Sequence, residues 1–416
     1  MKRLILLVLL ISGVAFAQPD RYVLTNATIH TATREPFQGY VVVVGDRIEE
    51  VGEGVASGGT QIDLGGGHLY PALIDADSAL GLVGVESLRA TRDNREVGLL
   101  NPNLVARYAY RAEADTVAVA RSQGVLYSGV NPTGSAIAGQ GSVMRTWGWD
   151  WEEMTVRPTW ALSVDWPGVE VSLKLEEEKK KKEALENIGK ALFFLNEAFD
   201  EARAYRQTDV QDVKWGALQP YARGEAPVLI RVDGKKQIRT ALDWSKEKGV
   251  KPVLVAGRDI HFFAEELAAR EIPVIYGSVF NQNPREAERY DLHYRVPGIL
   301  REAGVTVALS PMGLAFDVRE ERDLAGRTRA FGLTSVQALQ TITLNPARIL
   351  GVDDQLGSIE EGKKASFVLC QGNLLDVAPI VTRAWGEGRE IDLDDRQKEL
   401  YRKYKARIQE RSNQKN

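Results

Sequence analysis

The sequence predicts an α/β protein built around a parallel sheet. From Ala226 onward, short apolar runs alternate with helical stretches, which is the pattern of repeated strand–helix units. Before these units, residues 21–64 hold several β-rich runs, and Gly45-Asp46 between two of them indicates a hairpin. A chain of 416 residues is long enough for one large α/β barrel with an accessory domain, or for two to three ordinary domains.

The composition is that of a globular protein, with 44% hydrophobic and 26% charged residues. The formal net charge is −4 and the sequence pI is about 5.8. The chain as a whole therefore has no basic field that would indicate binding to nucleic acid or to an anionic membrane.

Residues 1–17 have the pattern of a secretory signal peptide. Lys2 and Arg3 form a positive start, residues 4–14 are apolar, and Ala15-Phe16-Ala17 is a small-x-small cleavage site before Gln18. The apolar run is shorter than the roughly 20 residues that span a bilayer. The sequence thus predicts an exported protein, periplasmic or secreted, with no membrane span after signal removal.

The stretch formed by residues 69–81 is expected to deliver polar side chains to the end of a buried strand. A proline-punctuated turn leads into an apolar run that ends in polar residues and a glycine. Other polar residues lie at or beyond the ends of two later strand candidates, which are residues 228–231 and 252–256. The candidate pocket residues are Asp75, Asp77, Arg231, Asp233 and His261.

Three segments follow the sequence pattern of a known family. Residues 69–81 match Pro-Gly-x-Ile-Asp-x-His-x-His at its proline, isoleucine and first aspartate. Residues 345–351 are Asn-Pro-Ala-Arg-Ile-Leu-Gly, and residues 357–365 are Gly-Ser-Ile-Glu-Glu-Gly-Lys-Lys-Ala. In these segments the chain resembles the amidohydrolase superfamily, in particular its exported, imidazolonepropionase-like members.

The resemblance implies a (β/α)8 TIM-like barrel with a composite β-sandwich from both ends of the chain. From the residues alone, seven barrel strands can be assigned. The implied units are a signal peptide at 1–17, the first half of the sandwich at 18–68, the barrel at 69–350, the second half of the sandwich at 351–392 and a C-terminal helix at 393–416.

The resemblance also implies a metal centre, but this chain has replaced its ligands. The superfamily takes two histidines from the first barrel strand, one each from the fifth and sixth, and an aspartate from the eighth. Such ligands hold a metal that lowers the pKa of a bound water. No metal cofactor is therefore expected, with weak binding of a divalent ion as the alternative. The matching positions are Asp77, Ala79, Arg231, Ala256 and Met312.

Three interpretations of the remaining polar residues stay open. Arg231 could bind the carboxylate of a substrate in a polar pocket. The carboxylates alone could bind a hard cation such as Ca²⁺. We favour the third, in which Arg231 takes over the positive charge of the metal and neutralises Asp77, because unpaired buried carboxylates are costly.

The histidines and the cysteine are expected to have structural roles. The four histidines are scattered, and only His261 lies near the expected mouth of the barrel. Cys370 is the single cysteine and lies in an apolar run, which predicts a small core residue and excludes an intrachain disulfide. The other histidines, expected at the surface or in hydrogen bonds, are His30, His68 and His293.

The resulting hypothesis is an exported amidohydrolase-superfamily protein that is metal-free, catalytically impaired and acts as a binding or partner subunit. The alternative is an active hydrolase of C–N bonds with an unconventional site. The expected partner is a second copy or a metal-containing paralogue, because residues 147–166 are dense in tryptophan and residues 87–103 form a long loop. A core role for those tryptophans is the competing interpretation. No small-molecule ligand can be named.

The first prediction is that the mature chain begins at Gln18. Intact-mass analysis of the exported protein should give the mass without residues 1–17, since the small-x-small site follows an apolar core of suitable length. An exported protein that still carries Met1 would contradict this.

Overall fold

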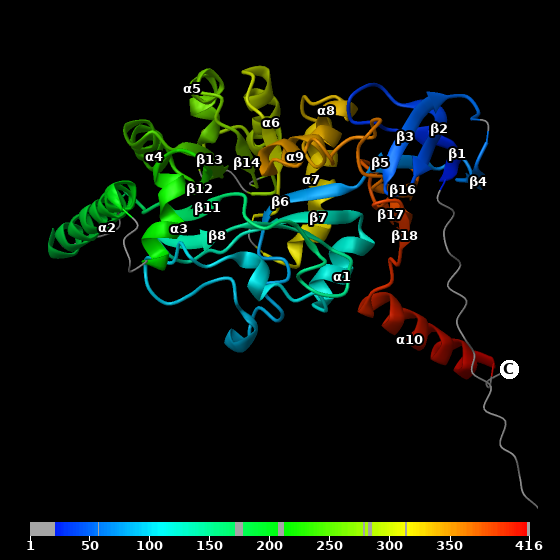
Figure 1. Cartoon of the computed structure of the whole chain (residues 1–416), viewed down its shortest axis with the longest axis horizontal. Helices are drawn as coiled ribbons and strands as arrows, with labels where there is room; N and C mark the ends of the chain where they lie inside the picture. Colours follow the sequence, from blue (N-terminus) through cyan, green and yellow to red (C-terminus); the bar gives the residue numbers. More distant parts are fainter. Residues whose placement is uncertain are drawn as a thin grey trace, which may run out of the picture.

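The computed structural model describes residues 21–56, 58–170, 178–206, 212–277, 279–281, 285–312 and 314–413. The predicted signal peptide at residues 1–17 lies outside these ranges. Within them the chain forms three β-sheets with α-helices packed around them, a mixed α/β fold (Figure 1).

One sheet has eight strands and combines the two ends of the chain. Its order is β18-β17-β16-β5-β1-β2-β3, with β4 paired to β1. Both ends of the chain therefore contribute strands to one sheet, where the resemblance implied a composite β-sandwich. The strands are β1 (Arg21–Ile29), β2 (Phe37–Val44), β3 (Arg47–Glu53), β4 (Thr60–Asp63), β5 (His68–Pro71), β16 (Phe367–Gln371), β17 (Ile380–Gly386) and β18 (Arg389–Ile391).

The stretch at residues 69–81 divides between two sheets. Its start is β5, which pairs in parallel with β1 and antiparallel with β16. After Ala72 the chain continues as β6 (Leu73–Ser78), every residue of which is buried. This stretch thus joins the composite sheet to the strands that carry the polar residues.

The other two sheets hold the strands expected for the barrel. A four-stranded sheet has the order β10-β9-β7-β6, and a six-stranded sheet has the order β15-β14-β13-β12-β11-β8. The additional strands are β7 (Val125–Val130), β8 (Ile137–Gln140), β9 (Ser142–Arg145), β10 (Thr155–Arg157), β11 (Leu162–Asp165), β12 (Pro227–Val232), β13 (Lys251–Ala256), β14 (Val274–Tyr276) and β15 (Val307–Leu309).

These two sheets do not close into one continuous hydrogen-bonded barrel within the described residues. On one side, Thr341 and Ile342 bridge them, because their carbonyl groups accept hydrogen bonds from Leu309 (2.9 Å) and Ile74 (2.9 Å). On the other side, part of the long loop pairs with β8 through single bridges at Leu100 and at Val105. The loop at residues 87–103 therefore fills the place next to β8.

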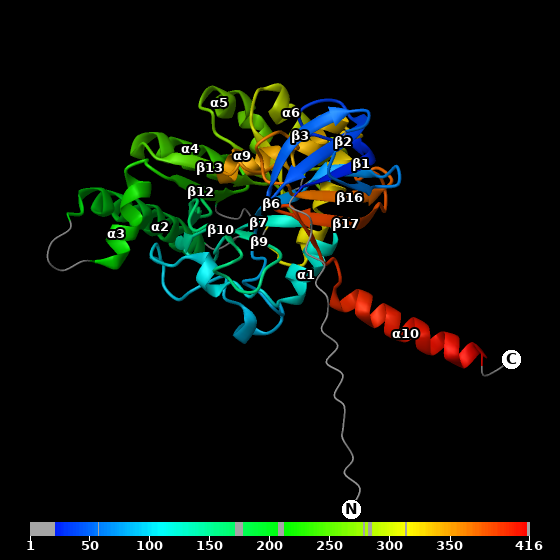
Figure 2. The same cartoon turned by 45° about the vertical axis from the view of Figure 1, so that its right-hand side comes forward.

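Helices cover the outside of these strands. Figure 1 shows α4, α5, α6, α8 and α9 along one side, and Figures 1 and 2 show α10 extending away from the body. The helices are α1 (Asp115–Ser122), α2 (Glu178–Ala204), α3 (Val213–Ala222), α4 (Lys235–Lys248), α5 (Ala264–Ala269), α6 (Leu292–Glu302), α7 (Glu321–Arg329), α8 (Ser335–Gln340), α9 (Leu344–Leu350) and α10 (Arg396–Asn413). Short 3₁₀ turns are η1 (Arg89–Thr91), η2 (Ala106–Ala109), η3 (Ile260–Phe263) and η4 (Asp317–Glu320).

Burial of apolar side chains separates two main cores. The larger one lies among the strands of the four- and six-stranded sheets and their helices, and a smaller one lies in the composite sheet around Tyr22, Phe367 and Trp385. Strands β6 and β7 are buried along their whole length, as strands of a parallel sheet covered on both faces should be, although β6 carries two aspartates. No helix in the described part of the chain is long and apolar enough to cross a membrane.

Candidate functional site

Parallel strands bring their carboxyl ends to one edge, and polar residues collect at that edge. Six of them form what we call the strand-end cluster. They come from β6, from the residue after β7, from the end of β11, from β12 and from the residue after β15. The members are Asp75, Asp77, Asn131, Asp165, Arg231 and Ser310.

The centre of the cluster is an ion pair between Arg231 and Asp77. Arg231 Nη2 donates to Asp77 Oδ1 at 2.8 Å, and Arg231 Nη1 donates to Asp77 Oδ2. The side chain of Asp77 is 0% exposed and that of Arg231 is 19% exposed. The expected pairing of these two residues is therefore confirmed, and it has the two-pronged geometry in which a guanidinium matches a carboxylate.

A second carboxylate lies on the other side of the guanidinium. Asp165 faces Arg231 in the register of β11 and β12, and its Oδ1 lies 3.4 Å from Arg231 Nε. Burial alone would lower the pKa of Arg231, but the charges of Asp77 and Asp165 and the hydrogen bonds to Asp77 outweigh it, so the pKa is raised. The guanidinium is thus held charged between the two acids.

Asn131 completes the contacts of Asp77. Its Nδ2 donates to Asp77 Oδ1 at 2.8 Å, and its Oδ1 accepts from Trp160 Nε1 at 2.9 Å. The buried indole of Trp160 therefore fixes the amide orientation, and the amide in turn fixes the carboxylate. Asn131 was not among the candidate residues predicted from the sequence, although its place directly after the apolar run of β7 was a usable signal.

The Asp75 carboxylate accepts its hydrogen bonds from hydroxyl and backbone groups, whereas Asp77 is paired with a cation. Ser128 Oγ donates to its Oδ2 at 2.7 Å, Ser310 Oγ lies 2.8 Å from its Oδ1, and the Asp77 amide donates at 3.2 Å. Burial raises the pKa of Asp75, and the hydrogen bonds of the serine hydroxyls oppose that rise. The Asp75 carboxylate is therefore bound by serine hydroxyls and a backbone amide, and its hydrogen bonds do not include Arg231.

A third buried acid, Glu321, was not expected from the sequence. It is the first residue of α7, its side chain is buried, and neither carboxylate oxygen has a hydrogen-bond partner within the described part of the chain. Burial, and after it the negative charge of Asp75, raises the pKa of Glu321 well above its usual range. Burial at this position therefore favours the neutral carboxyl over the carboxylate.

The remaining two candidates lie further out. Asp233 is more than half exposed, pairs with Arg258 at 3.3 Å, and lines the same pocket of about 440 Å³ as Arg231. His261 lies in η3 and stacks on Phe262, and burial lowers its pKa. Within the described residues, therefore, Asp233 shares a hollow with Arg231 while His261 does not line it.

The other replaced positions bring no polar group to the cluster. Ala79 and Ala256 are buried apolar residues. Met312 packs against Gly277, where an added Cβ would lie 1.9 Å from the Met312 Cγ. Ser310, two residues earlier, is the residue after β15 that reaches Asp75 and the carbonyl oxygen of Asp77, both at 2.8 Å. Ser310, and not the matched position Met312, is thus the residue after β15 that contacts the two acids of β6.

The residues present do not fit the metal centre that the resemblance implies. Both oxygens of Asp77 accept hydrogen bonds from Arg231, and Asn131 donates to one of them as well. No group of three or more His, Cys, Asp or Glu side chains placed to hold a metal is found among the described residues. A cation added here would have to compete with a guanidinium that is already paired.

Three histidines and the cysteine have structural surroundings. His30 Nε2 lies 2.9 Å from His68 Nδ1, and burial with the nearby His68 lowers the pKa of His30 to about 3. His293 Nδ1 lies 2.8 Å from the Tyr276 hydroxyl. Cys370 is fully buried, and burial raises the pKa of its thiol to about 12. The core role expected for Cys370 is confirmed.

The tryptophan-dense segment at residues 147–166 mostly contributes to the core. Trp160 and Trp166 are buried, whereas Trp149 is 87% exposed. Trp166 packs against Trp244 of α4 with ring centroids 5.1 Å apart. These positions favour the core interpretation over a contiguous exposed patch.

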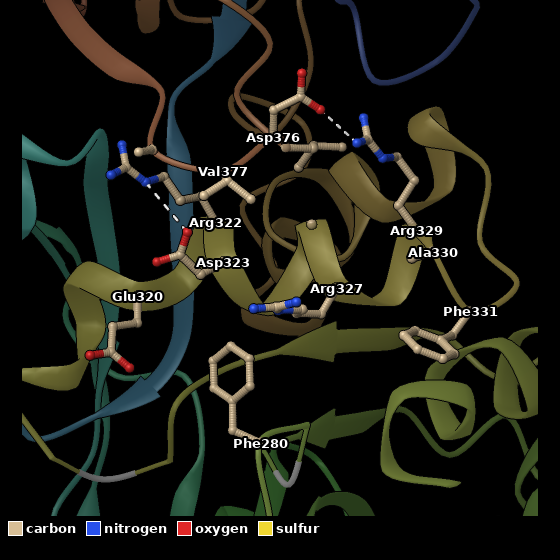
Figure 3. Close-up of a pocket in the computed structure, with 13 residues that line it drawn as sticks. Phe280, Glu320, Arg322, Asp323, Arg327, Arg329, Ala330, Phe331, Asp376 and Val377 are labelled. Carbon is tan, nitrogen blue, oxygen red and sulfur yellow. Dashed lines mark hydrogen bonds and ion pairs between the residues drawn. The ribbon is translucent and has the colours of Figure 1, made fainter. Parts of the chain in front are cut away.

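A larger hollow of about 810 Å³ lies beside α7 and contains none of the predicted site residues (Figure 3). Phe280 and Phe331 flank it, and Figure 3 shows Arg327 between Phe280 and the helix. Arg329 pairs with Asp376 at 2.6 Å. The lining of this hollow includes three arginines and three acidic residues, so its charges favour neither an anionic nor a cationic ligand.

Comparison with known proteins agrees with the resemblance. Residues 293–393 match the amidohydrolase family model. An amidohydrolase structure from Thermotoga maritima superposes with a TM-score of 0.78 at 24% identity, covering 89% of this chain and 99% of that one. The chain has an amidohydrolase fold and an amidohydrolase family segment. A structure of molinate hydrolase gives a TM-score of 0.52 at 14% identity, covering 91% and 96% of the two chains.

Curated relatives match only a part of the chain. A putative N-acetylgalactosamine-6-phosphate deacetylase of Escherichia coli K12 is 35% identical over 92 residues, 22% of this chain and 48% of that protein. A 5-methylthioadenosine/S-adenosylhomocysteine deaminase of Teredinibacter turnerae is 34% identical over 91 residues, 20% and 21% of the two chains. The chain spans about half the length of the first relative and about a fifth of the second.

The second prediction concerns the ion pair. Arg231→Ala should lower the free energy of unfolding by about 3–5 kcal/mol, because it leaves the buried Asp77 carboxylate without its charged partner. Arg21→Ala, which removes a pair with side chains 40% and 48% exposed, is the matched control and should cost less than about 1 kcal/mol. Denaturant unfolding measures both.

Replacing both charges should recover much of that loss. Arg231→Met combined with Asp77→Leu removes the buried charges together, which is often neutral or stabilising. Equal unfolding midpoints for the parent and Arg231→Ala would show that the pair does not stabilise the fold.

The third prediction concerns the buried acid. Burial raises the pKa of Glu321 in the folded state, whereas in the unfolded chain this residue ionises above about pH 4.3. Stability from this group is therefore full below that pH and is lost as the pH rises toward the raised pKa. Glu321→Gln should thus gain stability relative to the parent as pH rises from about 4 to 8, as seen by urea unfolding at each pH. If the free energy of unfolding changes with pH in the same way for the parent and for Glu321→Gln, then Glu321 is ionised in the folded protein.

Proposed function

We propose that this chain is a non-hydrolytic protein of the amidohydrolase fold that acts as a binding or partner subunit. The observation that carries the proposal is the two-pronged pair between Arg231 and Asp77 at the strand ends. In the resemblance, these two positions correspond to metal ligands. Here they neutralise each other, so the charge that a metal would supply is provided by the chain itself.

Metal-assisted amide hydrolysis needs an open metal position that can hold a water molecule. The carboxylate of Asp77 is engaged by Arg231 and Asn131, and that of Asp75 by serine hydroxyls and backbone. The buried Cys370 thiol, with its raised pKa, is unsuited to act as a nucleophile in place of a metal-bound water. These contacts support a site that positions ligands rather than one that activates water.

The pocket of about 440 Å³ beside Arg231 suggests what such a site would hold. Its lining joins Thr133 and Gln237 to the acids Asp165 and Asp233 and the cation Arg231. With two acids and one base, the lining favours a small polar ligand that is neutral or cationic and has hydrogen-bond donors.

We further propose that the strands of the four- and six-stranded sheets belong to one (β/α)8-like barrel and that the protein is exported. The bridging hydrogen bonds of Thr341 and Ile342 support the first, and the sequence of residues 1–17 supports the second. Association with a second copy or with a metal-containing paralogue is the proposed form of partnership.

The fourth prediction tests the non-hydrolytic role. Purified mature protein, dialysed and then analysed by mass spectrometry for metals, should retain far less than one equivalent of zinc, iron or manganese. It should not deacetylate N-acetylgalactosamine 6-phosphate or deaminate 5-methylthioadenosine, the substrates that the names of two relatives print, with or without added Zn²⁺.

Arg231→Ala is the informative companion variant, because it frees the carboxylates of Asp77 and Asp165. If Arg231 is what excludes a cation, this variant should take up more divalent metal than the parent. One tightly held equivalent of metal in the parent, or turnover of either substrate, would overturn the proposal and establish a hydrolase.

A further inference from the structure

The C-terminal helix α10 (Arg396–Asn413) has no buried residue. Both views show it extending from the body rather than lying on it (Figures 1 and 2). A helix of this length without packing is only marginally stable in water. Ion pairs at its start secure it, with Arg402 bound to Asp394 and Arg396 to Glu399. Its long exposed surface is therefore available to something outside the chain.

Apolar side chains form one stripe along this helix. Successive residues of an α-helix turn by about 100°, so residues spaced by three, four or eight positions share a face. Leu400, Tyr401, Tyr404 and Ile408 have this spacing, and the last three are 64%, 53% and 65% exposed. The spacing is that of one continuous helix face, and the stripe includes two tyrosines, each with an apolar ring and a polar tip.

Basic residues flank the stripe on both sides. On the same helical projection, Lys405 lies beside one edge and Arg407 beside the other, and Arg411 continues the line of the stripe beyond Ile408, while Glu399 and Glu410 lie on the opposite face. The ammonium of Lys405 lies 5.4 Å from the ring centroid of Tyr401. The helix carries seven basic and two acidic residues, a net charge of +5. The basic residues are Arg396, Lys398, Arg402, Lys403, Lys405, Arg407 and Arg411.

The positive net charge of α10 is opposite in sign to the net charge of the rest of the molecule. The whole chain has a formal net charge of −4, so everything outside α10 carries −9. A second copy of the helix packed on the stripe would bring +5 against +5, which is unfavourable. The occupant should instead be anionic and have an apolar layer beneath its charges.

We propose that α10 docks the protein on the surface of a membrane that contains anionic lipids. Basic side chains beside an apolar face are the features by which a helix lies in the interface plane without spanning the bilayer. Tyrosine is suited to the boundary between headgroups and acyl chains. This proposal is independent of the strand-end site.

The fifth prediction is binding of the full mature chain to vesicles in a sedimentation assay. It should bind vesicles of phosphatidylglycerol and phosphatidylcholine mixed equally, and bind phosphatidylcholine alone much more weakly. Because each basic residue near an anionic surface is worth about fivefold in affinity, Arg407→Gln with Arg411→Gln should weaken binding about 30-fold. High salt should weaken the parent in the same way.

A second pair of variants tests the stripe. Tyr404→Ser with Ile408→Ser should weaken binding at unchanged charge, whereas Ala406→Ser, on the opposite face, is the matched control and should bind like the parent. α10 lies against α1 only near its start, and the substituted residues are exposed, so all variants should keep the melting temperature of the body, which verifies folding.

Three results would overturn the proposal. One is no difference between anionic and neutral vesicles, and another is equal binding by the parent and the variants. The third is light scattering that shows self-association lost in the stripe variants without any vesicle binding, because a second copy would then be the occupant.

Discussion

The pairing of one buried guanidinium with a fully buried carboxylate is the constraint on which the strand-end edge depends. Taking a carboxylate out of water is costly unless a partner and further hydrogen bonds compensate it. Arg231 supplies the charge for Asp77, Asn131 supplies another hydrogen bond, and Trp160 fixes that amide. Asp165 on the neighbouring strand balances the remaining side of the guanidinium. Each of these groups is placed by a different strand or loop, so the pair ties the sheets together.

The protein handles its three most buried acids by three physical means. Asp77 is paired with a cation, Asp75 receives hydrogen bonds from Ser128, Ser310 and backbone, and Glu321 is kept neutral by burial beside the charge of Asp75. The consequence is an edge at which no carboxylate of the first strand is left over to bind a metal. The fold of an amidohydrolase is retained over 89% of the chain, while the groups at its strand ends serve one another.

Local charge matters more than the total in this molecule. The net charge of −4 indicated no affinity for an anionic surface, yet it is the sum of a strongly basic helix and an acidic body. Apart from its start, which pairs with Asp394 and lies against α1, the helix extends away from the body, so most of its charge is not offset by nearby acids of the body. A whole-chain average hides such a division, because it adds charges that never lie on the same surface.

The sequence by itself determined the order of strands and helices and the placing of Asp77 and Arg231 at strand ends. Those features follow from local alternation of apolar residues, which one stretch of chain displays alone. The pairing of the two chain ends was implied only by the resemblance to a known family. Only the tertiary structure decided that residues 69–81 divide between two sheets, that Ser310 rather than Met312 reaches the carboxylates, and that Glu321 is buried without a partner. Arg231 and Asp77 lie 154 residues apart. Contacts over such separations depend on strand register and packing, which no local pattern records.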